Sequence, residues 1–409
     1  MADIFQKVYD YTRLDEVKAG GYYPYYREIS SGQDTEVFIN NQRMIMLGSN
    51  SYLGLTSNEE VKHAAIQAVE KYGTGNAGSR FLNGTLDIHH QLEDELARFI
   101  GYEKGLLFGT GYMANLGVVS CLVGPRDYVV VDKMNHASIY DAISLAYGQF
   151  PHSSMKSSDY YGKLLKFKHN DIEHLERVLS RIESDRSVMV VVDGVFSMEG
   201  DIVKLPEIVK LKEKYKFRLV VDDAHATGVI GKGGRGTMSH FGMTPQEVDV
   251  TVTTFSKTFA SLGGAVLADT KVIDYLKHVS RPVIFSASPT PASTMAVLKS
   301  LEILKREPER IQRLWQITEK MNKAIRGLGF KVGPSETPII PIIIGTLHDC
   351  FTFWKEVSAE GVFVNPVIPP AVPENYCLIR TSYMATHTDE QLEYALSKFE
   401  KVGKKLGII

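Results

Sequence analysis

Short valine-rich apolar runs alternate with amphipathic helical stretches through the middle of this chain. Runs of strand length lie at 105–108, 128–131, 188–192, 219–221 and 250–253. They are mostly apolar at every position rather than at alternate positions, which is typical of parallel strands that helices cover on both faces. Between two of them, residues 170–182 carry apolar side chains at helical spacing, with Asn170 as the expected N-cap. The alternation predicts an α/β domain with a mostly parallel sheet.

The two ends of the chain differ from this middle section. The beginning predicts an arm and then a β-ribbon with strands at 36–39 and 43–47, because the asparagines between them tolerate the positive φ of a hairpin turn. A turn-rich segment near 286–291 precedes a long helical stretch, short strands and a last helix. At about 150 residues per domain, a chain of this length suggests two or three domains. We expect an arm and ribbon over 1–52, a large domain over 53–286 and a smaller α+β domain over 287–409.

Charge and cysteine content argue against several classes of protein. Lys and Arg number 46 against 48 Asp and Glu, a net charge of −2, which disfavours a general nucleic-acid binder. Cys121, Cys350 and Cys377 form no CxxC pair and no metal-ligand spacing, so we expect neither a disulfide framework nor a metal site. We see no signal-peptide pattern, and no apolar run approaches the ~20 residues that span a bilayer. A cytoplasmic protein is therefore expected.

Two ionisable residues follow predicted strands directly. Lys257 lies just after the strand at 250–253, where desolvation can lower the pKa of a lysine and allow it to form a Schiff base. Asp222 follows the strand at 219–221, and a carboxylate there can hold the ring nitrogen of a pyridoxal cofactor in the crevice of a parallel sheet. Taken alone, an ordinary surface lysine and a helix-capping or magnesium-binding aspartate are the commoner explanations. The chain has no GxxxxGK[ST] motif, which excludes a P-loop.

Two further loops follow predicted strands. Gly109-Thr-Gly-Tyr112 is a turn before a helix start, whose free backbone N–H groups can bind a phosphate, although a plain tight turn explains it as well. His136 could stack on a planar cofactor, or could be an ordinary hydrogen-bonded histidine in a loop. Because the carboxyl ends of parallel strands meet at one edge of a sheet, we expect all four loops to face one crevice.

The combined pattern resembles the α-oxoamine synthases, which are fold-type I pyridoxal 5'-phosphate (PLP) enzymes. It comprises Asp-x-x-His at 222–225, Ser-Lys-Thr at 256–258, Gly-Thr-Gly-Tyr at 109–112 and Asn-His-Ala-Ser at 135–138. These enzymes condense an amino acid with an acyl-CoA and release carbon dioxide. Segments 72–85, 193–201 and 378–388 resemble the members that join L-serine to palmitoyl-CoA and form 3-oxosphinganine. The resemblance runs from about residue 20 to the end of the chain and implies an aspartate-aminotransferase-like fold.

The resemblance implies a role for each residue that matches the family. Lys257 would bind PLP covalently and act later as base or acid. Asp222 would pair with the pyridine nitrogen and His225 with the phenolic oxygen of the ring. His136 would stack on the ring and help to place the substrate carboxylate, which Arg380 would bind.

Other matching residues would complete the site. Asn50 would help to bind substrate at the edge of the cofactor, and Ser197 would lie near the ring hydroxyl. The residues expected at the phosphate are Gly111, Tyr112, Thr254, Ser256 and, from the facing subunit, Ser286 or Ser288. Ile368 departs from the pattern, because some relatives carry an arginine there that assists carboxylate binding. Carboxylate recognition would then depend on Arg380 and His136, or on another residue.

The resemblance also implies a homodimer in which the facing subunit completes each site. Several alternatives share the same core: 2-amino-3-oxobutyrate CoA ligase and 5-aminolevulinate synthase, which use glycine, and 8-amino-7-oxononanoate synthase, which uses alanine. A catalytically silent subunit is a further alternative, against which the intact Lys257 argues, and bound PLP would exclude a plain structural protein. Since the expected substrate and product are lipids and no anchor is evident, we expect a cytoplasmic enzyme that touches the inner face of the membrane transiently.

Overall fold

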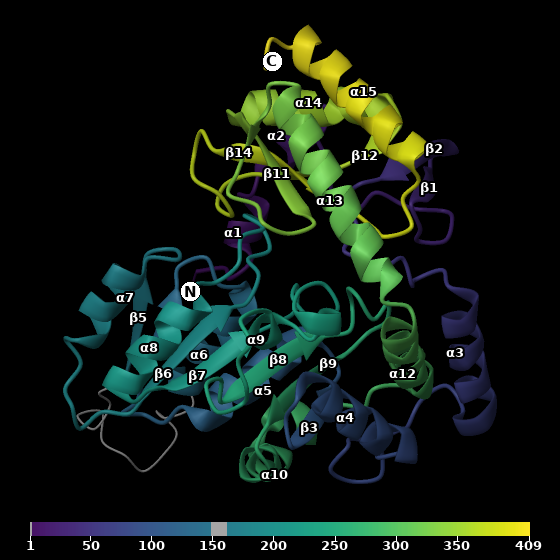
Figure 1. Ribbon diagram of the computed structural model, residues 1–409. Helices are drawn as coiled ribbons and strands as arrows, with labels where there is room; N and C mark the ends of the chain where they lie inside the picture. Colours follow the sequence, from purple (N-terminus) through teal and green to yellow (C-terminus); the bar gives the residue numbers. More distant parts are fainter. Residues whose placement is uncertain (1, 149–161) are drawn as a thin grey trace.

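A seven-stranded sheet forms the centre of the protein, as described by a computed structural model of residues 2–148 and 162–409 (Figure 1). Its strand order is β3-β9-β8-β7-β6-β4-β5. The strands are β3 (Lys104–Phe108), β4 (Tyr128–Asp132), β5 (Lys163–Phe167), β6 (Val188–Asp193), β7 (Arg218–Asp222), β8 (Val250–Thr254) and β9 (Gly264–Ala268). Of these seven, β9 runs antiparallel to both neighbours and the others share one direction. The predicted α/β architecture with a mostly parallel sheet is confirmed.

The five strands expected from the sequence are all present, whereas β5 and β9 were not predicted. β5 lies at an edge of the sheet, and Lys163 and Lys166 interrupt its apolar run. β9 is fully buried, but it is built partly from glycine and alanine, which are poor strand formers. Both strands therefore take their conformation from their neighbours in the sheet.

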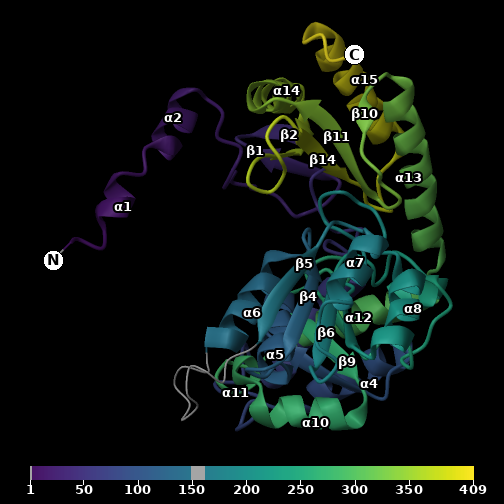
Figure 2. The ribbon, with the colours of Figure 1, turned by 90° about the vertical axis from the view of Figure 1, so that its left-hand side faces the viewer.

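Helices cover both faces of the sheet, which explains why its strands are apolar throughout (Figure 2). Successive side chains of a strand point to opposite faces. Val129 and Val131 pack in one core cluster with α5, α6 and α10, whereas Val130 packs in the other with α4, α7 and α8. These helices are α4 (Asp87–Ile100), α5 (Gly111–Leu122), α6 (Ala137–Gly148), α7 (Ile172–Leu179), α8 (Leu205–Tyr215) and α10 (Thr270–Val279).

A second sheet lies in the C-terminal part of the chain, with strand order β10-β11-β14-β13. Its strands are β10 (Lys331–Val332), β11 (Ile339–Gly345), β13 (Asn365–Val367) and β14 (Cys377–Ser382), and its neighbouring helices are α13 (Glu309–Gly327), α14 (Leu347–Ala359) and α15 (Asp389–Lys405). Helix α12 (Pro291–Arg306) instead packs against α3 (Glu59–Tyr72), beside the central sheet (Figure 1). The division of the chain at residues 52 and 286 stays a prediction.

The predicted ribbon is present as β1 (Glu36–Ile39) and β2 (Gln42–Met46), with Asn40 and Asn41 at φ 50° and 62°. β2 also pairs with β12 (Val362–Phe363), so the ribbon joins the C-terminal part of the molecule. The arm that precedes it, with α1 (Gln6–Tyr9) and α2 (Arg13–Ala19), extends away from the body (Figure 2). Short turns of helix complete the fold: η3 (Lys232–Gly234), α9 (Thr237–His240) and α11 (Arg281–Ile284). Within the described ranges, no helix combines the length and apolar character needed to cross a membrane.

The start of α7 differs from the sequence expectation. Its N-cap is Asp171, whose carboxylate accepts from the backbone N of His174 at 2.9 Å, and Asn170 does not cap it. The Asn170 side chain points elsewhere and donates to Asp201 at 2.8 Å. The prediction of Asn170 as N-cap was wrong because a tertiary contact uses its amide.

Candidate active site

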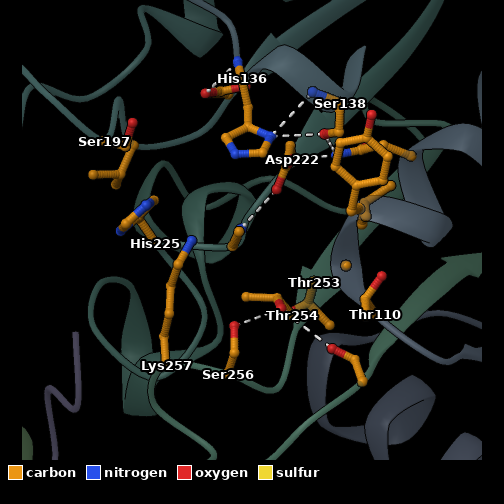
Figure 3. Close-up of a pocket in the computed structure, with 18 of the residues that line it drawn as sticks. Thr110, His136, Ser138, Ser197, Asp222, His225, Thr253, Thr254, Ser256 and Lys257 are labelled. Carbon is orange, nitrogen blue, oxygen red and sulfur yellow. Dashed lines mark hydrogen bonds between the residues drawn. The ribbon is translucent and has the colours of Figure 1, made fainter. Parts of the chain in front are cut away.

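A cavity of about 270 Å³ lies at the carboxyl ends of the central parallel strands (Figure 3). It brings together most of the residues that the sequence singled out. The expected site residues in its lining are Gly111, Tyr112, His136, Ser197, Asp222, His225, Thr254, Ser256 and Lys257. The four loops therefore face one crevice, as the geometry of a parallel sheet requires.

Lys257 lies in the turn after β8, and Figure 3 shows its amino group pointing into the cavity near His225. Burial lowers the pKa of Lys257 to about 8; Asp222 opposes this change, and the positive charge of Arg380 adds to it. A fraction of the amino groups is then neutral near pH 7. A neutral amine is a nucleophile and a base, so this lysine can form a Schiff base and move protons.

Asp222 ends β7, and its carboxylate is held from two sides. One oxygen accepts from the backbone N of Ala224 at 2.9 Å, and the other accepts from the Asn115 amide on α5 at 2.6 Å. The same Asn115 amide donates to Ser138 at 2.9 Å. Sequence reasoning gave Asn115 and Ser138 no role, although Ser138 lies in the Asn-His-Ala-Ser motif that carried the resemblance. Asn115 follows Gly111 by one helical turn, which is the signal that could have placed it at the cavity.

The hydrogen bonds around His136 fix its tautomer. Its Nδ1 lies 2.7 Å from the Ser138 hydroxyl and accepts from the Ser138 backbone N at 3.3 Å. Partial burial lowers the pKa of His136, Asp222 opposes this, and Lys257 adds to it. The ring is therefore neutral near pH 7 and carries its proton on Nε2, as a donor. Asp193, which the sequence analysis gave no role, accepts from the His136 backbone N at 3.2 Å.

His225 is a second neutral imidazole in the cavity. Its Nδ1 lies 2.7 Å from the hydroxyl of Tyr52, which sequence reasoning missed. Burial raises the pKa of Tyr52 to about 12, so its hydroxyl keeps its proton and can donate it to Nδ1. Burial also lowers the pKa of His225 well below its usual value, and Lys257 and Arg380 act in the same direction. His225 Nε2 then carries a proton that can be donated to an oxygen of a bound molecule.

Arg380 and Asn50 lie beside this cavity rather than among its lining residues. Arg380 is 5% exposed, and its guanidinium donates to the backbone O of Ser197 at 2.6 Å and to the Asn50 side chain at 2.9 Å. Within residues 2–148 and 162–409, no carboxylate lies within ion-pair distance of it. A buried cation without a counter-ion is costly, and a substrate carboxylate would supply that counter-ion. Ile368 lies in an apolar groove with Met198 and Phe351 and cannot take this role.

The start of α5 forms the other end of the cavity. Thr110 caps this helix by accepting from the backbone N of Met113 at 3.1 Å. A Cβ on Gly111 would lie 2.8 Å from the Thr254 side chain, so a glycine keeps the space between the helix start and Thr254 open. We call this space the phosphate cradle. The hydroxyls of Thr254 and Ser256 lie 3.1 Å apart at the same end. Backbone N–H groups at a helix start together with hydroxyls suit a phosphate.

The remaining phosphate candidates are placed differently. The Tyr112 ring is exposed and its hydroxyl donates to Asp141. Ser288 is buried against Gly78 of its own chain, donating to its backbone O at 3.1 Å, and neither it nor Ser286 lines the cavity of one subunit. Their contribution from a facing subunit stays a prediction.

Residues 42–399 match the family model of aminotransferase class I and II. The chain belongs to this family. It is 48% identical to a serine palmitoyltransferase of Sphingobacterium spiritivorum, over 98% of this chain and 97% of that protein. It is 40% identical to an 8-amino-7-oxononanoate synthase of Thermosipho melanesiensis, over 98% of this chain and 100% of that protein.

Solved structures agree with these relatives. The chain superimposes on the serine palmitoyltransferase of Sphingomonas wittichii with a TM-score of 0.93 and 34% identity, covering 100% of both chains. A serine palmitoyltransferase with PLP as an internal aldimine gives a TM-score of 0.93 at 31% identity, again over 100% of both chains. The α-oxoamine synthase resemblance and the fold-type I fold are thereby confirmed.

Proposed function

We propose that the protein is a PLP-dependent acyltransferase that condenses L-serine with palmitoyl-CoA. The products are 3-oxosphinganine, CoA and carbon dioxide, the first step of sphingolipid synthesis. The observation that carries this proposal is the near-complete match, at 48% identity, to a serine palmitoyltransferase. The cavity supports it independently, because the Gly111 cradle, the Asp222 carboxylate and the Lys257 amine fit the phosphate, ring nitrogen and aldehyde of PLP.

PLP, when bound, supplies an electron sink for the amino-acid substrate. Asp222, oriented by Asn115 and Ala224, would keep a proton on the ring nitrogen. Lys257 would hold the cofactor in the resting enzyme and then take a proton from the substrate Cα, for which a pKa of about 8 is well matched. His225 would donate a hydrogen bond to the ring oxygen through Nε2.

Carboxylate placement would set which substrate bond breaks. The guanidinium of Arg380 and the Nε2–H of His136 are the donors that this chain offers to the amino-acid carboxylate. Donors on two sides would orient the carboxylate, which would leave Lys257 as the group that takes the Cα proton. Such alignment gives large rate advantages without new chemistry.

An assay with paired substrates tests this proposal. CoA release is measured with L-serine, glycine or L-alanine, each with palmitoyl-CoA and with short-chain acyl-CoA. We expect kcat/KM to be highest for L-serine with palmitoyl-CoA, by at least about tenfold, because a site selects substrates through contacts in the transition state. A preference for L-alanine or glycine would overturn the substrate and favour the 8-amino-7-oxononanoate synthase or glycine-using alternatives.

We also propose a homodimer with shared active sites. Large apolar side chains are exposed on one chain at Phe81, Leu82, Leu262 and Phe285, and Leu262 lines the cavity. A facing subunit would cover them and bring Ser286 or Ser288 to the phosphate. A sedimentation measurement that finds monomer at working concentrations would contradict this.

We further propose a cytoplasmic protein that contacts the inner face of the membrane transiently. Its substrate and product are lipids, and the arm exposes Ile4, Phe5 and Val8. The arm is therefore the candidate contact segment. Failure of the protein to float with anionic lipid vesicles at low salt would contradict this proposal.

A further inference from the structure

His169 lies just beyond β5, outside the cavity, between two buried carboxylates. Its Nδ1 is 3.1 Å from Asp132, and its Nε2 is 3.1 Å from Asp201. Asp132 is 1% exposed and Asp201 is 7% exposed. Since ionised carboxylates only accept hydrogen bonds, both ring nitrogens carry protons and the ring is a cation. Burial lowers the pKa of His169, but the hydrogen bonds to Asp132 and Asp201 outweigh it and raise the pKa to about 10.

One of these carboxylates shapes the loop that ends at His136. Asp132 is the last residue of β4, and its carboxylate also accepts from the backbone N of Met134 at 2.8 Å. Its backbone O accepts from the backbone N of Asn135 at 3.1 Å. The turn directly before His136 is therefore built around the partner of His169.

The second aspartate, Asp201, closes the loop that carries Ser197 through its backbone. The backbone O of Asp201 accepts from the backbone N of Phe196 at 3.1 Å. The Phe196 ring stands edge-on to His169, with ring centroids 4.4 Å apart. The next residue, Ser197, accepts from Arg380 at 2.6 Å through its backbone O. The position of the Arg380 guanidinium thus depends on a loop that His169 holds at two points.

We infer that His169 is a positioning residue that ties the His136 loop to the Ser197 loop and so sets where His136 and Arg380 meet the substrate carboxylate. The inference rests on the proposed function, because the carboxylate is that of the amino acid. A neutral side chain at this position would leave two buried carboxylates, Asp132 and Asp201, without their shared cation. Removing one member of such a buried cluster destabilises the fold, because it leaves buried charge uncompensated. Movement of one or both loops would expose the carboxylates to water and lower this cost.

The test compares His169→Gln with the control His174→Gln in the PLP-loaded protein. His174 lies on the same segment and accepts from the backbone N of Lys168 at 2.9 Å, with no hydrogen bond to either loop. The dissociation constant for L-serine is measured from the change in the visible absorbance. We expect it to rise by about tenfold to about 100-fold in H169Q and to stay within about twofold of wild type in H174Q. The KM for palmitoyl-CoA should stay within about twofold in both variants.

A merely structural role would change the thermal midpoint and the yield of loaded protein, and leave the L-serine dissociation constant of the loaded fraction unchanged. That outcome in H169Q would overturn the inference.

If H169Q does not fold, Asp201→Asn replaces it, since it keeps the size of the side chain and weakens the same contact. We expect D201N to weaken L-serine binding too, and unchanged L-serine binding in D201N would also contradict the inference. A wild-type protein that responds to no amino acid would overturn the proposed function and this inference with it, whereas a responding wild type with unaltered variants would overturn the inference alone.

Discussion

Replacing Lys257 with alanine is expected to lower turnover by at least about 10³-fold, because the variant loses the group that would bind the cofactor and move the Cα proton. Burial lowers the pKa of Lys257 to about 8, and among the described residues no other lysine lines the cavity, so we expect no other lysine to substitute for it. The visible absorbance of covalently attached PLP should disappear as well, although PLP can still bind through the phosphate cradle. CoA release and the visible spectrum are the two measurements.

Lys271→Ala is the matched control, since Lys271 is exposed on α10 and lies outside the cavity lining. It should keep wild-type turnover and spectrum within about twofold. Wild-type turnover together with a wild-type spectrum in K257A would contradict the assignment of the cavity as the active site.

Replacing Arg380 with lysine is expected to weaken L-serine binding by at least about 100-fold, which is about 2.7 kcal/mol. Lysine keeps the positive charge, but its single amine cannot hold the Ser197 backbone O and the Asn50 side chain while presenting a planar pair of donors to a carboxylate. The expected change lies in the KM and the dissociation constant of the amino acid. Binding of PLP should change little, because Arg380 is not among the residues of the phosphate cradle.

Arg218→Lys serves as the control for this substitution. Arg218 begins β7, at the opposite end of the strand from Asp222, and forms an exposed ion pair with Asp249 at 2.7 Å. Exposed pairs of this kind contribute about 1 kcal/mol or less, so the L-serine dissociation constant should not move. Equal L-serine affinity in R380K and wild type would show that another group binds the carboxylate.

The sequence predicted the sheet and the crevice well, because both follow from short-range patterns. Consecutive buried apolar residues such as Val129, Val130 and Val131 are typical of a strand that is covered on both faces. Lys257 and Asp222 each follow such a strand directly, so the topology of the sheet alone brings them to one edge. β9 was not foreseen, since its place between β3 and β8 is decided by pairing with both neighbours.

The contacts that hold the functional side chains in place could not be predicted from the sequence in the same way. Arg380 meets Ser197 and Asn50, which lie 183 and 330 residues away in the chain. His169 and Asn170 likewise reach Asp201, and this contact removes Asn170 from the helix cap that local propensity had assigned to it. Such contacts depend on how loops from different elements fold over one another, and neither periodicity nor propensity encodes that.

The most direct test of the central claim is a titration of the purified, PLP-loaded protein with L-serine, glycine and L-alanine in parallel, followed by visible absorbance. We expect a visible PLP spectrum that changes at the lowest concentration with L-serine, because Arg380 and His136 would hold its carboxylate within reach of Lys257. A response at lower concentration to glycine or L-alanine would keep the family and contradict the substrate. The absence of any visible PLP spectrum, even after PLP is added, would contradict the account as a whole.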